Sequence, residues 1–224
     1  AGGRAEALLV SVVSGMTEAS DAVPPGRYAK GVIKREAILD AALGVFGQVG
    51  FEGATLREIA RQVGVSHQSL MHYFPTKQDL LIAVLRRRDE RLRRHFNDPA
   101  GMAVAELISL AEYNAGVPGH IELFSIAAAE ATAPNHPGHE YYTQFYENIV
   151  GSTATFLRAA QRKGMLKPGV EPEAAARIVL ALVDGLQLQW LYDPESVEVA
   201  PLVRSVLESL LTVDLEELNK LGNE

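Results

Sequence analysis

Hydrophobic residues recur every three or four positions through most of the chain, and Gly or Pro residues separate one such segment from the next. This spacing is typical of amphipathic helices, and no strand-like alternation competes with it. We expect helices at about 32–49, 55–63, 66–74, 77–95, 100–115, 119–132, 137–163, 172–192 and 195–220. The pattern therefore predicts an all-α fold.

The first of these helices turns one apolar side toward a small core, and Gly50 is predicted to end it. The residues on that side are Ile38, Ala41, Ala42, Val45, Phe46 and Val49. We expect Phe51, just after the helix, to fill the core that it makes with the next two helices.

Residues 55–77 contain the signals of two short helices with a tight corner between them. Thr55 and Glu58 have the spacing of a capping box at the start of the first helix. Gly64 supplies the positive φ that ends this helix, and Ser66 is a suitable N-cap for the second. We expect Leu70 and Phe74, on one face of the second helix, to be buried. The pattern predicts a helix-turn-helix.

The second helix leaves polar residues at its start and on its outer side. A helix that enters the major groove of DNA reads base edges with residues near its N-terminus. Gln68 suits adenine, and Met71 suits a thymine methyl group. The alternative to base recognition, for an isolated motif of this kind, is that these polar residues are simply exposed to solvent.

Residues 38–85 resemble the DNA-binding domain of the TetR family of transcriptional repressors. The matching residues are Ile38-Leu39-Asp40-Ala41-Ala42, Phe46, Gly50-Phe51, Thr55, Ile59-Ala60, Val63-Gly64-Val65-Ser66, Leu70 and Tyr73-Phe74-Pro75-Thr76-Lys77-Gln78-Asp79-Leu80-Leu81. The resemblance implies phosphate contacts from Thr55, Tyr73 and Lys77, and base contacts from His67, Gln68, Ser69 and Met71. Ser66 and His72 complete the predicted DNA-binding set, although His72 stands where the family often has a larger aromatic residue.

The charge distribution agrees with a DNA-binding end. Residues 27–95 hold 13 Lys and Arg against 7 Asp and Glu, a balance of +6, whereas the whole chain has a net charge of −7. Phosphate binding needs only the local charge to be positive. We interpret the run Arg86–Arg88 and Arg91–Arg94 as a solvated face rather than as DNA contacts.

The remaining composition narrows the function classes. The chain has no Cys, which excludes disulfides and thiolate chemistry and is compatible with a cytoplasmic protein. No uninterrupted run of about 18 apolar residues predicts a membrane span. Without a G-x-S-x-G, P-loop or H-E-x-x-H motif, we expect neither an enzyme nor a cofactor. A helical enzyme or ligand-binding scaffold that does not bind DNA is the alternative.

Two histidines, His136 and His139, lie near Glu130 and Glu140 and have the chemistry of zinc ligands. Pro and Gly residues are interleaved with them, which favours a loop with solvated histidines. We therefore expect no metal site there.

The later helices are predicted to bind an effector and to form a homodimer. The resemblance implies a small-molecule pocket among the middle helices, and we expect its lining to be mostly apolar. The candidates are Leu107, Leu110, Tyr113, Asn114, Phe124, Ile126, Glu130, Tyr142, Phe145, Tyr146, Gln187 and Trp190. The segment 174–191 is apolar nearly all round, which is more than one monomer face requires. The predicted dimer residues are Ile178, Leu182, Leu186, Val203, Val206, Leu207 and Leu210.

Three regions follow from these observations. Residues 1–30 are predicted to be an N-terminal extension or linker, in which Met16 is a candidate natural start and the first fifteen residues a remnant of upstream sequence. Residues 31–78 are the predicted helix-turn-helix DNA-binding domain, and residues 79–224 the helical effector-binding and dimerisation domain. The predicted function is a transcriptional repressor that binds a pseudo-palindromic operator as a dimer and is released by a small-molecule effector.

Overall fold

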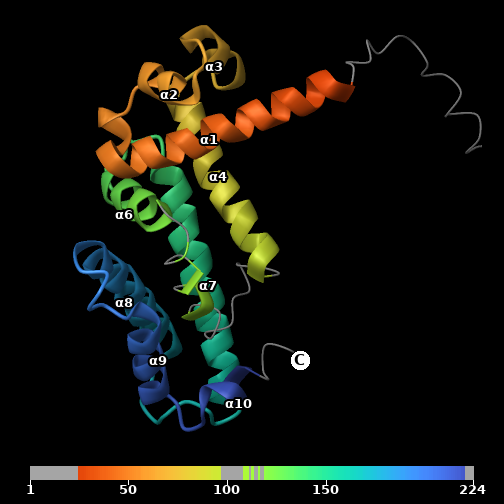
Figure 1. Ribbon diagram of the computed structural model, residues 1–224. Coiled ribbons are helices and arrows are strands. Elements are labelled where there is room, and N and C mark those ends of the chain that lie inside the picture. The colour runs from red at the N-terminus through yellow and green to blue at the C-terminus, as the bar shows by residue number, and fades with distance from the viewer. Residues whose placement is uncertain (1–24, 97–107, 111, 114–115, 117–118, 220–224) are drawn as a thin grey trace, which may run out of the picture. The chain divides into compact units, whose positions relative to one another are not determined.

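The computed structural model describes residues 25–96, 108–110, 112–113, 116 and 119–219 (Figure 1). In that part of the chain the regular structure is helical, apart from one isolated bridge between Leu166 and Leu211, so the predicted all-α fold is confirmed. The helices are α1 (Pro25–Gly53), α2 (Leu56–Val63), α3 (His67–Tyr73), α4 (Lys77–Phe96), α6 (His120–Glu130), α7 (His139–Arg162), α8 (Pro172–Tyr192), α9 (Val199–Leu210) and α10 (Leu215–Asn219). Most of the helix predicted at 100–115 and the segment 1–24 lie outside the described residues.

The chain divides into two compact units, Ala1–Arg35 and Glu36–Glu224. In the first unit, the described residues 25–35 form the first turns of α1. The contacts that position the candidate site all lie within the second unit.

Two expectations from the sequence are wrong, one about the extent of a helix and one about the burial of a side chain. The helix predicted at 195–220 is two helices, because α9 ends at Leu210 and α10 begins at Leu215. Val49 is 53% exposed rather than buried, because α1 kinks at Gly50, where φ is 70°. Val49 lies just before the kink, and its side chain lies beside Gly53 in the short turn that follows the kink.

Buried apolar side chains form two clusters. The first joins α1–α4 and includes Phe51, as predicted, together with Leu123 and Phe124 of α6 and Tyr142 of α7. The second lies among α7–α10 and reaches Leu92 of α4. Because α4 contributes to both clusters, it links the helix-turn-helix to the helical body. The extent of the DNA-binding domain, 31–78, remains a prediction.

Candidate DNA-binding surface and effector site

Local caps build the helix-turn-helix. The hydroxyl of Thr55 accepts a 3.2 Å hydrogen bond from the backbone N–H of Glu58, and the hydroxyl of Ser66 accepts a 3.1 Å bond from that of Ser69. Gly64 ends α2 with a φ of 71°, a conformation that costs little only for glycine. The Thr55 and Ser66 caps and the Gly64 corner are confirmed. The capping box is only half formed, because the Glu58 carboxylate accepts hydrogen bonds from Arg61 and Gln62 instead of from the Thr55 N–H.

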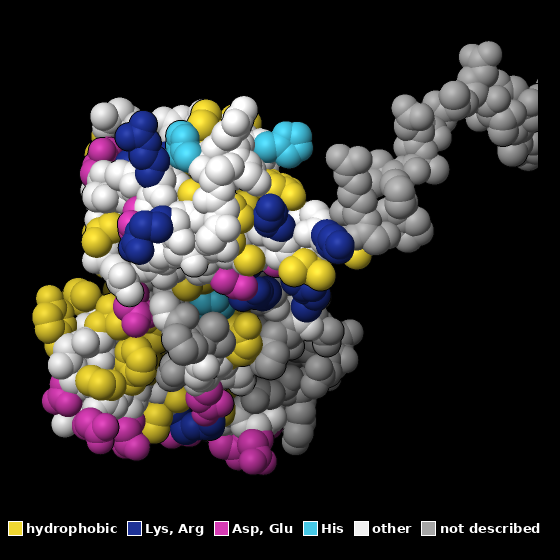
Figure 2. Space-filling view, turned by 45° about the horizontal axis from the view of Figure 1, so that its top comes forward, with side chains coloured by type: hydrophobic (Ala, Val, Ile, Leu, Met, Phe, Trp, Pro, Cys, Tyr) yellow, Lys and Arg dark blue, Asp and Glu magenta, His cyan; other side chains and the backbone are white. Residues whose placement is uncertain are grey.

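The helix α3 buries Leu70 and Phe74 and turns its other residues outward. All nine residues of the predicted DNA-binding set are exposed or partly exposed, namely Thr55, Ser66, His67, Gln68, Ser69, Met71, His72, Tyr73 and Lys77. Figure 2 shows Lys, Arg and His side chains on the end of the surface that carries α2 and α3, and Asp and Glu side chains beside a broad hydrophobic area toward the other end. This face is open to a ligand, and its contacts with DNA remain a prediction.

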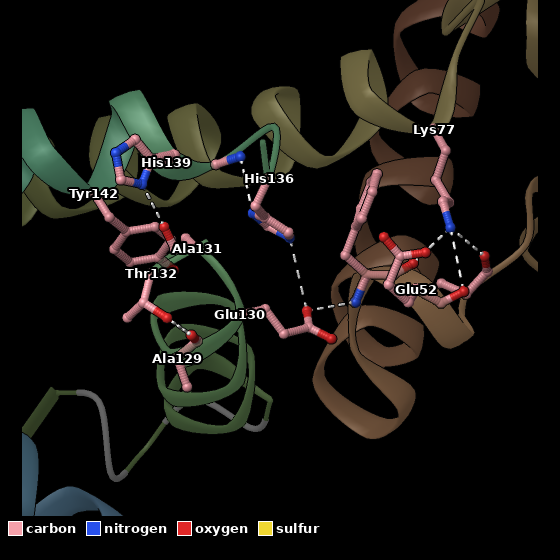
Figure 3. Close-up of polar contacts among 12 residues, drawn as sticks. Glu52, Lys77, Ala129, Glu130, Ala131, Thr132, His136, His139 and Tyr142 are labelled. Atoms are coloured by element: carbon pink, nitrogen blue, oxygen red, sulfur yellow. Dashed lines mark hydrogen bonds and ion pairs between the residues drawn. The ribbon is translucent and has the colours of Figure 1, made fainter. Parts of the chain in front are cut away.

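Lys77 has a structural role that the sequence did not indicate (Figure 3). Its Nζ donates to the carbonyl oxygens of Phe51, Glu52 and Ala54 at 2.7, 3.3 and 3.1 Å. The ammonium also lies 4.3 Å from the centre of the Phe51 ring. An ammonium has three N–H donors, so a DNA phosphate would compete with these carbonyls for the Lys77 side chain.

The arginine run on α4 is only partly solvated, contrary to the sequence interpretation. Arg87 and Arg88 are buried, whereas Arg86 is exposed. The guanidinium of Arg87 pairs with Glu36 at 3.1 Å and with Asp40 at 2.7 Å, and both of those carboxylates belong to α1. Arg87 therefore ties the middle of α4 to α1.

Four candidate pocket residues form one aromatic cluster between α6 and α7. Phe124 packs edge-on against Tyr142 and Phe145, with ring centres 5.3 and 5.2 Å apart, and Phe145 packs against Tyr146 at 5.4 Å. The hydroxyl of Tyr146 donates a 2.8 Å hydrogen bond to Asp184 of α8. This cluster lies where helices from both apolar cores meet.

The other candidates are dispersed around it. Leu110 and Gln187 are buried, Ile126 is partly exposed, and Tyr113 and Trp190 pack at the edge of the second core. Leu107 and Asn114 lie outside the described residues. Their roles as effector contacts remain predictions.

Ionisable side chains border the aromatic cluster, and the sequence reading missed them. The guanidinium of Arg88 lies 4.4 Å from the centre of the Phe124 ring. Burial raises the pKa of Asp184, while the hydrogen bond from Tyr146 and the charge of Arg88 oppose that shift. Arg88 was detectable in principle, because it follows Leu81, Val84 and Leu85 at helical spacing on the buried face of α4.

Glu130 ends α6, at the opposite end of that helix from His120. Figure 3 shows its carboxylate directed toward His136. Its Oε2 accepts a 2.7 Å hydrogen bond from the backbone N–H of Phe51 and lies 3.9 Å from Nε2 of His136. The imidazole of His136 stacks edge-on against Phe51 at 5.1 Å and accepts a bond from Gly138 N–H. Burial lowers the pKa of His136, although the Glu130 carboxylate opposes the shift.

The expectation that the two loop histidines are solvated is therefore wrong for His136. For His139, Nδ1 lies 2.7 Å from the carbonyl oxygen of Ala131. Among the residues that the structure describes, no group of three or more His, Cys, Asp or Glu is placed to hold a metal ion.

The predicted dimer residues separate into two groups. Leu186, Val203 and Leu207 are buried within the protomer, whereas Ile178 is 59% exposed and Leu182, Val206 and Leu210 are partly exposed. Three further apolar side chains are exposed, namely Leu188, which lies within the predicted apolar segment 174–191, and Tyr192 and Leu202, which were not predicted. An exposed apolar stripe thus runs along α8 and continues on α9.

The fold and the exposed α3 define a helix-turn-helix protein with a helical companion domain. Residues 38–84 match the bacterial regulatory proteins of the tetR family, and residues 124–213 match the C-terminal region of BetI-type transcriptional repressors. The chain belongs to the TetR family of transcriptional regulators.

Individual relatives agree with this assignment. The chain is 55% identical over 53 residues to the HTH-type transcriptional regulator RutR of Escherichia coli K12, a match that spans 24% of this chain and about a quarter of that relative. GusR of Salmonella enterica has a TM-score of 0.63 at 27% identity, over 87% of this chain and 100% of that one. A transcriptional regulator from Saccharomonospora viridis, solved in complex with choline, has a TM-score of 0.67 at 22% identity, over 81% of this chain and 100% of that one.

Proposed function

We propose that this chain is a sequence-specific DNA-binding repressor that acts in the cytoplasm as a homodimer and leaves its operator when a small molecule binds. The observation that carries the proposal is the orientation of α3. Leu70 and Phe74 hold one face of that helix in the core, while Gln68 and Met71 extend from the outer face. A recognition helix anchored from behind is the arrangement that reads the major groove.

In this proposal the DNA-binding residues divide into those that contact bases and those that contact the DNA backbone. Base edges are contacted by His67, Gln68, Ser69 and Met71, and the DNA backbone by Thr55, Ser66, His72, Tyr73 and Lys77. A two-fold dimer reads two half-sites about one DNA turn apart, which makes the operator a pseudo-palindrome.

The dimer forms through the exposed stripe on α8 and α9. Ile178, Gly185 and Tyr192 follow one another at intervals of seven residues, with Leu188 between the last two, which is the spacing of a helix-packing seam. By length and hydropathy α8 also qualifies as a candidate membrane span. We assign its apolar surface to a second copy of the chain because its other face is buried against α7 and α9.

The helix α4 couples the effector to DNA. Arg87 holds α1 through Glu36 and Asp40, and the next residue, Arg88, faces the aromatic cluster of the body. The choline complex of the Saccharomonospora viridis protein supports a small-molecule effector for a body of this fold. An effector that shifts α4 changes the distance between the two recognition helices and so lowers operator affinity.

The test begins with DNA fragments selected from a random pool by the purified protein. Fluorescence anisotropy then compares Gln68→Ala with Gln144→Ala, a matched change at an exposed position on α7. We expect Gln68→Ala to lose about 1–3 kcal/mol of discrimination at one base position, because one bidentate contact disappears. Gln144→Ala should bind like the wild type. A wild-type protein that selects no sequence, or two variants that behave alike, would contradict the proposal.

Lys77→Ala separates the two roles suggested for that side chain. Loss of three hydrogen bonds to carbonyl groups should lower the free energy of unfolding by about 1–3 kcal/mol in urea titrations. A phosphate contact would in addition reduce the slope of log affinity against log salt by about 0.9. An unchanged slope would leave Lys77 with the structural role alone.

A further inference from the structure

Two buried basic side chains in the body have nitrogen atoms without a hydrogen-bond partner among the described residues. Arg88 is 3% exposed and His120 is 1% exposed. Within the described part of the chain, no partner lies within hydrogen-bond reach of Nε and Nη1 of Arg88 or of either ring nitrogen of His120. Buried polar atoms are nearly always paired, so four unpaired nitrogens in two neighbouring side chains call for an explanation.

The two side chains approach the same place from different helices. His120 begins α6, and Phe124 lies one turn later, so the two residues share a face of that helix. The guanidinium of Arg88 comes from α4 and lies over the Phe124 ring, and the Phe145 ring centre is 6.0 Å away. A group placed between Arg88 and His120 would therefore touch both polar side chains and an aromatic wall.

Nearby acidic side chains do not neutralise Arg88 well. Oδ1 of Asp89 is 3.6 Å from Nη1, and it already accepts a 2.7 Å hydrogen bond from the Tyr141 hydroxyl. Asp184 is engaged by Tyr146. Among the described residues, the guanidinium also has a hydrogen bond with the Tyr141 hydroxyl and lies over the Phe124 ring. These contacts are weaker than a charge-assisted pair of hydrogen bonds to a carboxylate.

We propose that the effector is a small monocarboxylate, with Arg88 as its anchor and His120 as a second polar contact. The proposal rests on the proposed function and names the chemical class of its effector. A guanidinium presents its N–H groups as a planar fork that matches a carboxylate. The aromatic cluster suits an apolar remainder of the ligand. A dianionic phosphate would bring more negative charge than one guanidinium offsets.

The chemical class can be tested without knowing the natural effector. Thermal unfolding is measured with straight-chain acids from butyrate to laurate, with benzoate and phenylacetate, and with the primary amide of each acid. The same measurement is made with choline and with inorganic phosphate, as a cation and an anion of other classes. We expect at least one acid to raise Tm by about 5 °C or more at saturation, and its amide, choline and phosphate to have little effect.

Arg88→Met is the decisive variant, and Arg86→Met, at an exposed position of the same helix, is its control. We expect Arg88→Met to weaken the active acid by about 30-fold or more while the free protein keeps or gains thermal stability. Arg86→Met should respond like the wild type. Should Arg88→Met fail to fold, Arg88→Lys, which keeps the charge but loses the fork, should also weaken the acid.

Three outcomes would overturn this inference: no acid binds, the amides or choline bind equally well, or the acid still binds to Arg88→Met. The proposed function is judged separately, by the binding of selected DNA in the absence of any ligand. A protein that binds DNA but ignores carboxylates would refute the effector class alone.

Discussion

The carboxylate of Glu130 accepts a 2.7 Å hydrogen bond from the backbone N–H of Phe51, which lies 79 residues earlier in the chain. Through this bond the end of α6 holds the turn in which α1 finishes. Lys77, at the start of α4, holds carbonyl groups of the same turn. A movement that separates α6 from α1 must therefore break or lengthen the bond to Phe51.

Replacing Glu130 by Ala should destabilise the protein. The Phe51 N–H would lose its acceptor at a partly buried position, which costs about 1–3 kcal/mol in the free energy of unfolding. Urea titration measures the loss, and Glu140→Ala, at an exposed position of α7, is the matched control. If both variants were as stable as the wild type, the contact would not contribute to holding α6 against α1.

Gly50 and Gly64 should respond differently to the same substitution. Their φ angles are 70° and 71°, but a Cβ at Gly50 would lie 2.2 Å from Oε1 of Glu130, whereas a Cβ at Gly64 would meet nothing within 4 Å. Gly64→Ala should therefore cost about 1–2 kcal/mol for the left-handed backbone alone. Gly50→Ala should cost more for two reasons: its ψ of −178° lies in a region that is essentially restricted to glycine, and the new Cβ would displace the Glu130 carboxylate. Equal losses in urea titrations would contradict this close contact.

The sequence predicted the helix-turn-helix well because its determinants are local. The Thr55 and Ser66 caps and the positive φ of Gly64 each depend on a few neighbouring residues. Gly50 was predicted to end the helix, whereas it kinks α1, which continues to Gly53, and the exposure of Val49 was not predicted.

The body was harder to predict because its determinants are contacts between distant segments. Arg87 and Arg88 look like part of a solvated charge run until α1 and α6 pack against α4. In the same way, an apolar helix such as α8 has one face that is buried within its own protomer and one that is exposed. The amino-acid composition of the helix does not show which residues lie on which face. Leu186 therefore proved to be buried within the protomer, while Leu188 of the same predicted apolar segment is exposed.

The stability of the protein should fall in mild acid because of His120. Burial and the charges of Arg88, Arg91 and Arg87 lower the pKa of His120 from 6.5 to about 4, and Asp40 opposes the shift. Between these two pH values the unfolded chain binds more protons than the folded one, so stability decreases as the pH falls from 6.5 toward 4. Each unit of pKa difference corresponds to about 1.4 kcal/mol.

Urea titrations across this pH range test the assignment. We expect His120→Gln, which cannot take up the proton, to show a flatter dependence of unfolding free energy on pH than the wild type. His72→Gln, at an exposed position of α3, should keep the wild-type slope. An unchanged slope in His120→Gln would mean that other groups cause the loss of stability in acid.

A charge on the apolar stripe of α8 should separate the two subunits of the proposed dimer. Ile178 is 59% exposed and Tyr192 is 85% exposed in the single chain, so substitution there leaves the core of the protomer intact. In a two-fold interface each substitution occurs twice, and an unpaired carboxylate is costly to bury. We expect Ile178→Asp to raise the dimer dissociation constant by about 30-fold or more, as measured by analytical ultracentrifugation.

The same variant should also bind operator DNA weakly, because each monomer would then hold one half-site without help from the other. Thr143→Asp, at an exposed position of α7, adds the same charge away from the stripe and should leave both the dimer and the DNA affinity unchanged. If Ile178→Asp remained a tight dimer, the subunits would have to meet elsewhere. The apolar surface of α8 would then need a different partner, because leaving large apolar side chains exposed to water is unfavourable in free energy.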